Sequence, residues 1–186
     1  MPLPLHEPID WVRVAVATSF YARRGYQHVE VPWVVPPHVS EATLPPGILS
    51  RKTQDGDLIG SGEQGLLALA IEGRLAPGLY QTTTPCFRDD VPDRLHGKHF
   101  VKVELMHLAV EPNVEQLIDA AVTFFSTWVP VHVVRIDDSQ WDIVDTGGGV
   151  ELGSYGIREA LGVRWAYGTG VAEPRMSTVQ RSCSLG

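Results

Sequence analysis

One predicted strand carries an aromatic ring, a cation and a carboxylate at alternating positions, Phe100, Lys102 and Glu104. Side chains at alternating positions share one face of a strand, so these three groups lie in line. Arg88 ends the preceding predicted strand, where its forked guanidinium could hold a phosphate. Such a strand face is more typical of a ligand-binding surface than of a face buried in the hydrophobic core. The alternative, a surface hairpin with charged residues on its wet side, stays open on these residues alone.

Two acids on neighbouring predicted strands, Asp142 and Glu151, could hold Mg²⁺, which prefers a few carboxylates together with phosphate oxygens. A glycine turn at residues 147–149 joins the two strands. The alternative is that both acids are exposed strand residues. A later strand contains Gly168-Thr169-Gly170, with Arg175 five residues beyond it. Glycines in such a strand can also mark close backbone packing.

Hydrophobic periodicity and turn residues predict the elements that must position these groups. Strands outnumber helices and are joined by short turns, which predicts an α+β fold, an antiparallel sheet flanked by helices, in a single domain over residues 1–186. Asn113 is the expected N-cap of one helix. The predicted helices span residues 9–24, 63–75 and 113–128, and the predicted strands span 26–35, 80–88, 100–110, 131–136, 140–145, 150–158 and 163–171.

Three segments, in this order along the chain, resemble the three motifs of the class II aminoacyl-tRNA synthetase core. Residues 23–32 are similar to the first motif, and Phe87-Arg88-Asp89-Asp90 with Phe100 is similar to the second. Residues 168–175 are similar to the third. Because residues 150–158 look like a Glu-x-Gly-Gly-Gly-Ser-x-Arg stretch, the resemblance is nearest to the aspartyl, asparaginyl and lysyl subgroup.

The resemblance implies an ATP site. Arg88 would bind the α-phosphate, and His96 would face the γ-phosphate. The adenine would be stacked between Phe100 and Arg175, and Arg175 would also neutralise the γ-phosphate. Asp90 stands where the family has a glutamate that reads the adenine edge.

The same resemblance implies a reaction and a metal. A substrate carboxylate would attack ATP to give an acyl-adenylate and pyrophosphate. Arg88 and Arg175 are the expected catalytic residues, because they would stabilise the developing charge. Asp142 and Glu151 are the expected metal ligands, with Glu151 also part of the ATP site. ATP and Mg²⁺ are therefore the expected cofactors.

An amino-acid site is implied as well. Glu63 and Gln64 belong to a segment that stands in the place of the family's Ser-x-x-Gln, which touches the bound amino acid. Lys102 stands where many members have a glutamine near the substrate carboxylate, and Glu104 lies beside it on the same face. Arg158 is the expected substrate-side residue. A forked guanidinium suits an acidic or amide side chain, so Asp, Asn or Glu is the expected substrate.

The first motif forms the dimer interface in this family, so the resemblance implies a homodimer. Residues 29–35 would form an exposed apolar strand, and pairing with a second copy would cover an edge that is otherwise prone to aggregation. The alternative is an internal strand.

Composition narrows the class of protein. The 186 residues carry a net charge of −7, which argues against a protein that coats nucleic acid. The sequence favours a cytoplasmic protein. Its two cysteines lack metal-ligand spacing, no apolar run is long enough for a membrane span, and no leader is recognised.

Without a recognisable anticodon-binding segment, the expected role is amino-acid activation for an acceptor that is not identified, with tRNA not excluded. The alternative is a regulatory paralog that binds ATP or an amino acid without turnover.

Overall fold

The computed structural model describes residues 8–44, 48–88 and 99–184. Within this part of the chain, the framework is a seven-stranded sheet in the order β1-β5-β6-β10-β9-β8-β7. β1 and β5 run parallel, and the other neighbours are antiparallel, so the predicted α+β fold is confirmed. The strands are β1 (Gln27–His28), β5 (Gly78–Phe87), β6 (His99–Leu108), β7 (Val131–Arg135), β8 (Gln140–Asp145), β9 (Glu151–Ala160) and β10 (Val163–Glu173).

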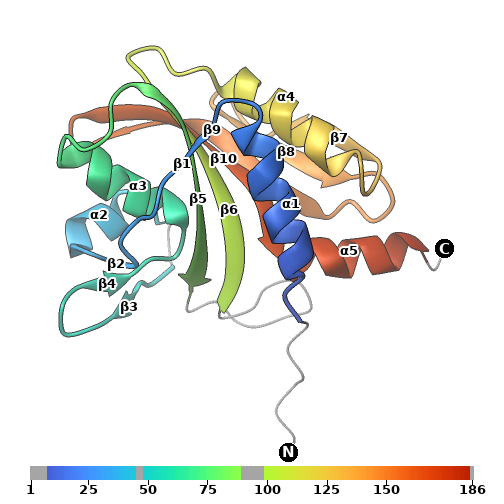
Figure 1. The fold of residues 1–186 in the computed structure, drawn as a ribbon, viewed down its shortest axis with the longest axis horizontal. Helices are drawn as coiled ribbons and strands as arrows, with labels where there is room; N and C mark the ends of the chain where they lie inside the picture. Colours follow the sequence, from blue (N-terminus) through green and yellow to red (C-terminus); the bar gives the residue numbers. More distant parts are fainter. Residues whose placement is uncertain (1–7, 45–47, 89–98, 185–186) are drawn as a thin grey trace, which may run out of the picture.

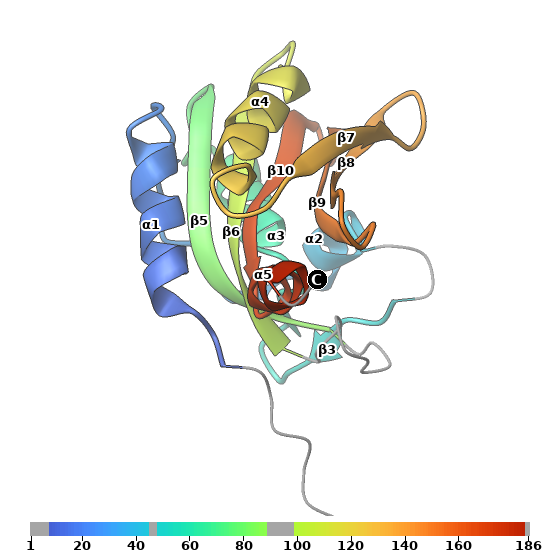
Figure 2. The ribbon, with the colours of Figure 1, turned by 90° about the vertical axis from the view of Figure 1, so that its right-hand side faces the viewer.

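Helices cover both faces of this sheet (Figures 1 and 2). One face packs against α1 (Trp11–Ala22), α4 (Val114–Phe125) and α5 (Arg175–Ser184). The opposite face packs against α3 (Gly62–Ile71), behind which lies α2 (Pro37–Glu41). A small sheet on this side, within the described residues, has the order β2-β4-β3, with β2 at Val34–Val35, β3 at Arg51–Lys52 and β4 at Asp57–Leu58.

Capping residues explain where the helices begin and end. The side chain of Asn113 accepts a hydrogen bond from the Gln116 amide at 3.0 Å, as predicted for an N-cap. α3 ends at Ile71, earlier than predicted, because Gly73 adopts a left-handed φ of 68°. The amides of Gly73 and Arg74 then donate hydrogen bonds back to the last turn of the helix, which ends it.

Among the described residues, no helix has both the length and the apolar character needed to cross a membrane.

The predicted continuous strand over residues 26–35 is wrong. Only β1 and β2 are strands in this region, and they belong to different sheets. The intervening Val31 packs onto α3 at Gly65, where an added Cβ would lie 2.6 Å from the Val31 side chain. Val31 is held by a helix rather than by strand pairing, and alternation alone does not distinguish the two.

The strand register places four chain segments at one end of the large sheet. Phe87 pairs with His99, and Val101 pairs with Glu173, so the end of β5, the start of β6 and the end of β10 lie together. β9 is antiparallel to β10, so β9 begins at this end too. We call this region the Arg88 end of the sheet, after the residue that follows β5.

Candidate active site

Arg88 and Phe100 meet at the Arg88 end. Arg88 directly follows β5, and its Nε donates a hydrogen bond to the carbonyl oxygen of Gly60 at 3.0 Å. Its guanidinium carbon lies 5.3 Å from the centre of the Phe100 ring, on the neighbouring strand β6. The hairpin therefore brings the predicted phosphate-binding arginine and the predicted adenine-stacking ring together, as a cation–π pair.

Arg175 and Glu151 form the other half of this end. Arg175 is the first residue of α5, and Glu151 is the first residue of β9. The Nη1 atom of Arg175 lies 3.1 Å from Oε1 of Glu151. The Glu151 side chain is 46% exposed, so this ion pair is open to solvent and to a ligand.

Asp142 lies on the adjacent strand β8, two residues before Val144, which pairs in register with Glu151. One of its carboxylate oxygens, Oδ1, is buried without a hydrogen-bond partner among the described residues. Burial raises the pKa of Asp142, and the negative charge of Glu151 raises it further. An orphaned oxygen in a pair of mutually repelling carboxylates fits a divalent cation. The described residues hold no cluster of three or more His, Cys, Asp or Glu ligands, so phosphate oxygens and water would complete the coordination.

The predicted substrate residues gather around Glu63, in what we call the Glu63 cluster. Glu63 is buried in the first turn of α3. Its Oε2 lies 2.6 Å from Nη1 of Arg158, and its Oε1 accepts a hydrogen bond from Nε1 of Trp165 at 2.7 Å. Burial raises the pKa of Glu63, while the positive charge of Arg158 opposes that rise. Arg158 in turn lies over the Tyr167 ring, 4.1 Å from its centre.

Lys102 and Glu104 complete the Glu63 cluster from β6. The Nζ of Lys102 lies 2.7 Å from Oε1 of Glu104, and the Ser61 hydroxyl donates to the same oxygen. Gly62 makes this possible, because an added Cβ there would lie 3.1 Å from Glu104. The charge of Glu104 also contributes to the raised pKa of Glu63. The Lys102–Glu104 and Arg158–Glu63 ion pairs are therefore neighbours.

Three solved structures with a similar fold are synthetases. Seryl-tRNA synthetase from Pyrococcus horikoshii, complexed with ATP, superposes with a TM-score of 0.73 at 19% identity, over 92% of this chain and 49% of that one. Cytoplasmic serine-tRNA ligase from Naegleria fowleri, in complex with AMP, gives 0.72 at 18% identity, over 91% and 48%. The pyrrolysyl-tRNA synthetase PylSc from Desulfitobacterium hafniense gives 0.72 at 15% identity, over 96% and 72%.

The fold is that of the class II synthetase core. The chain spans about half the length of the two seryl enzymes. No family model matches the sequence, and no curated protein matches it. These three structures are seryl and pyrrolysyl enzymes, so the nearness to the aspartyl, asparaginyl and lysyl subgroup stays a prediction. The predicted ATP-binding residues Asp90 and His96 lie outside the described residues.

Gln64 lies next to the Glu63 cluster of this synthetase-like fold, but it bonds to the backbone. Its Oε1 accepts from the Gly60 amide at 2.8 Å, and its Nε2 donates to the Ser40 carbonyl at 3.0 Å. Gly60 is also the residue whose carbonyl receives Arg88. Gln64 thus braces the loop on which Arg88 rests, and its contact with a substrate stays a prediction.

Trp165 and Tyr167 were missed by sequence reasoning. Trp165 is fully buried and pairs in register with Arg158, across the turn that joins β9 to β10. Aligning the two predicted strands around that turn would have placed Trp165 beside Arg158. The pairing of Arg158 with Glu63, 95 residues away, had no comparable local signal.

The two glycines at positions 168 and 170 are required by packing. A Cβ at Gly168 would lie 2.5 Å from the Tyr155 ring, and one at Gly170 would lie 2.8 Å from the Tyr21 ring. The Tyr21 hydroxyl also donates to the Gly170 carbonyl at 2.9 Å. Close backbone packing, the alternative raised from the sequence, is therefore confirmed. It fixes the strand that leads to Arg175.

The two cysteines have opposite environments. Cys86 is fully buried on β5, paired in register with Phe100, and burial raises its pKa to about 11. Cys183 is exposed near the end of α5.

Proposed function

We propose that this protein activates an amino acid, or a related carboxylate, at the expense of ATP. An oxygen of the substrate carboxylate attacks the α-phosphorus and forms a bond to it. The bond from that phosphorus to the oxygen bridging to the β-phosphate breaks, which releases pyrophosphate and leaves an acyl-adenylate. The observation that carries the proposal is the meeting of Arg88, Phe100, Glu151 and Arg175 at one end of four adjoining strands.

The roles follow from the chemistry of each side chain. Arg88 contacts the α-phosphate, where negative charge grows as the carboxylate attacks. Phe100 and Arg175 hold the adenine by stacking, which is worth ~1–3 kcal/mol per base. The reaction needs no general base, because the attacking carboxylate is already ionised. Catalysis then consists of positioning and electrostatic stabilisation.

Asp142 and Glu151 would hold Mg²⁺ in this proposal. A bound magnesium supplies neutralisation of the phosphate charge. Glu151 would then exchange part of its contact with Arg175 for the metal, which frees the guanidinium for the nucleotide. Asp90 and His96 keep their proposed contacts with the adenine edge and the γ-phosphate.

The Glu63 cluster supports an uncharged substrate side chain. The positive charges of Arg158 and Lys102 are already paired with Glu63 and Glu104. An acidic substrate would have to displace a carboxylate that is buried and also bonded to Trp165. Among the expected substrates, the amide of Asn therefore fits better than the acids Asp and Glu.

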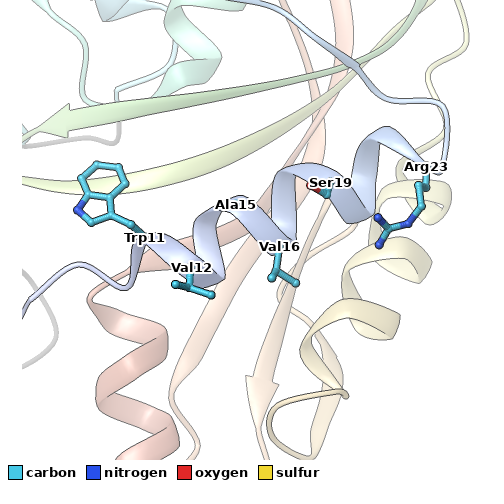
Figure 3. Close-up of a pocket in the computed structure, with 6 residues that line it drawn as sticks. All are labelled: Trp11, Val12, Ala15, Val16, Ser19 and Arg23. Carbon is cyan, nitrogen blue, oxygen red and sulfur yellow. The ribbon is translucent and has the colours of Figure 1, made fainter.

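A two-fold homodimer belongs to the same proposal. The outer face of α1 forms an open apolar surface, on which Trp11 is 62% and Val12 is 73% exposed (Figure 3). Val31 packs onto α3 instead of facing outward, so this helix replaces the strand predicted for the contact. Contiguous exposed apolar surface of this kind marks protein–protein contacts. Light scattering at micromolar concentration should give about twice the 20.4 kDa chain mass, and Val12→Glu should give the monomer.

The decisive experiment is pyrophosphate exchange into ATP, screened across the twenty amino acids with Mg²⁺ present. One or a few amino acids should support exchange, and Arg88→Ala should slow it by ~10²–10³. The acceptor is then sought by offering the adenylate tRNA, carrier proteins and small amines in turn. ATP binding without exchange for any amino acid would overturn the enzyme proposal in favour of a regulatory module.

A further inference from the structure

Arg13, the third residue of α1, holds α5 from the other end of the chain. It is only 3% exposed. Its Nη1 donates hydrogen bonds to Oε1 of Glu173 and, at 2.9 Å, to the Ser177 hydroxyl. Its Nη2 donates to Oε1 of Gln180. One side chain therefore contacts both the residue that ends β10 and one side of the helix that follows.

The neighbours of Arg13 close off its guanidinium. The Trp128 ring lies over it, with the guanidinium carbon 4.6 Å from the ring centre. The Asp10 carboxylate, 3.4 Å away, adds a second acid. A charge held in this way is costly to leave without its partner. The Arg13–Glu173 contact is therefore a fixed link, unlike an exposed ion pair that forms and breaks freely.

Glu173 connects Arg13 to the start of α5. It is fully buried, and it lies two residues before Arg175. Its Oε2 accepts a hydrogen bond from the Ser177 amide at 3.4 Å, one of the amides that the first turn of a helix leaves without a partner. Burial raises the pKa of Glu173, and the hydrogen bonds from Ser177 and the charge of Arg13 oppose that rise.

We propose that Arg13 is a positioning residue for Arg175, acting through Glu173. Met176 and Val179 bury one side of α5 in the core, and Arg13 holds Ser177 and Gln180. Together these contacts set the rotation of the helix whose first residue is Arg175. Active-site groups displaced by about 1 Å lose much of their effect. The inference rests on the proposed function in one respect, that Arg175 binds ATP.

The test removes both buried charges at once, with Arg13→Met combined with Glu173→Gln, so that neither charge is left alone. Val14→Ala is the matched control, because Val14 is the next residue of α1 and is 5% exposed. The first measurement is hydrogen exchange over residues 175–184. The double variant should exchange about ten-fold faster or more over this helix, as expected for a helix that opens locally. Val14→Ala should not. Unchanged exchange in the double variant overturns the inference.

The second measurement asks whether Arg13 acts through Arg175, by the ATP affinity of a double-mutant cycle. The Arg13→Met/Glu173→Gln variant should bind ATP about ten-fold more weakly. Adding Arg175→Ala to it should give no more than the loss caused by Arg175→Ala alone, because residues that act as one unit are not additive. Additive losses, or an equal loss in Val14→Ala, overturn the inference. A wild-type protein that does not bind ATP overturns the proposed function instead, and hydrogen exchange still decides the role of Arg13.

Discussion

The Arg88 end and the Glu63 cluster both contain ion pairs between basic side chains and carboxylates, but the two regions differ in their exposure to solvent. At the Arg88 end the ion pair joins side chains that are 20% exposed in Arg175 and 46% exposed in Glu151. In the Glu63 cluster the carboxylates are nearly buried, with side-chain exposures of 8% for Glu63 and 4% for Glu104. The first region can exchange its partners for a ligand at little cost. The second is already satisfied, so its charges act as fixed scaffolding.

The difference has an electrostatic origin. An exposed ion pair contributes little to stability, because water solvates each charge nearly as well as its partner does. A buried charge loses that solvation, so its partner must remain. The comparison therefore predicts that substitutions at the Arg88 end lower ATP binding or the rate of reaction, whereas substitutions in the Glu63 cluster lower the free energy of unfolding.

The largest effect is expected at Arg88. Arg88→Ala should lower the rate of pyrophosphate exchange by ~10²–10³, because it removes one preorganised donor from the developing charge. Thermal stability should change little. Arg135→Ala is the control, since that arginine is 60% exposed on β7 and pairs with a surface acid. A loss of less than ten-fold in Arg88→Ala would contradict the assigned role.

Two matched arginine substitutions test the comparison directly. Arg158→Met leaves Glu63 buried without its cation and should destabilise the protein by ~2–3 kcal/mol, below the full cost of a buried pair because the Arg158 side chain is 31% exposed. Arg175→Met should cost less than ~1 kcal/mol, since its partner is open to water. Urea unfolding measures both. Equal losses would show that the two regions do not differ in the way described.

A smaller effect is expected at the ring beside Arg88. Phe100→Ala should weaken ATP binding about ten-fold or more, because stacking contributes ~1–3 kcal/mol per base. Isothermal titration calorimetry measures the loss. Phe100→Tyr keeps the stacking surface and should retain most of the affinity. Unchanged ATP binding in Phe100→Ala would remove Phe100 from the nucleotide site.

The smallest effect is a change in pH dependence at Glu63. Its pKa in the folded protein lies above the ordinary 4.5, so the folded state keeps a proton that the unfolded chain releases. Stability from this group is therefore present below pH 4.5 and is lost as pH rises through the folded pKa. In that window, wild-type stability should fall relative to Glu63→Gln by at most ~1.4 kcal/mol per pH unit. If the free energies of unfolding of the two proteins change with pH in parallel, the pKa of Glu63 is not raised.

Long, strongly patterned elements of the fold were predictable from the sequence. The β5–β6 hairpin and the Asn113 cap follow from side-chain alternation and capping chemistry, which are local. The two-residue strands β2, β3 and β4 were not predictable, because so short a strand carries no periodic signal. Residues 26–35 show the same limit, since their alternation is compatible with packing onto a helix.

The candidate site divides in the same way. Arg88, Phe100 and Arg175 could be placed by local motifs and by the strand that each one follows or lies on. The pairing of Arg158 with Glu63 and the grip of Arg13 on Glu173 join residues that are 95 and 160 positions apart. Such contacts depend on how helices dock on the sheet, and no local pattern encodes that docking.

The unequal environments of the two cysteines make the protein selectively reactive. A thiol must ionise to attack an alkylating reagent. With a pKa of about 11, buried Cys86 is ionised in only about one molecule in ten thousand at neutral pH. Cys183 is exposed and lies on α5, eight residues after Arg175. A maleimide fluorophore or spin label should therefore attach to Cys183 alone, and it would report the movement of the helix that carries Arg175 without any engineered residue.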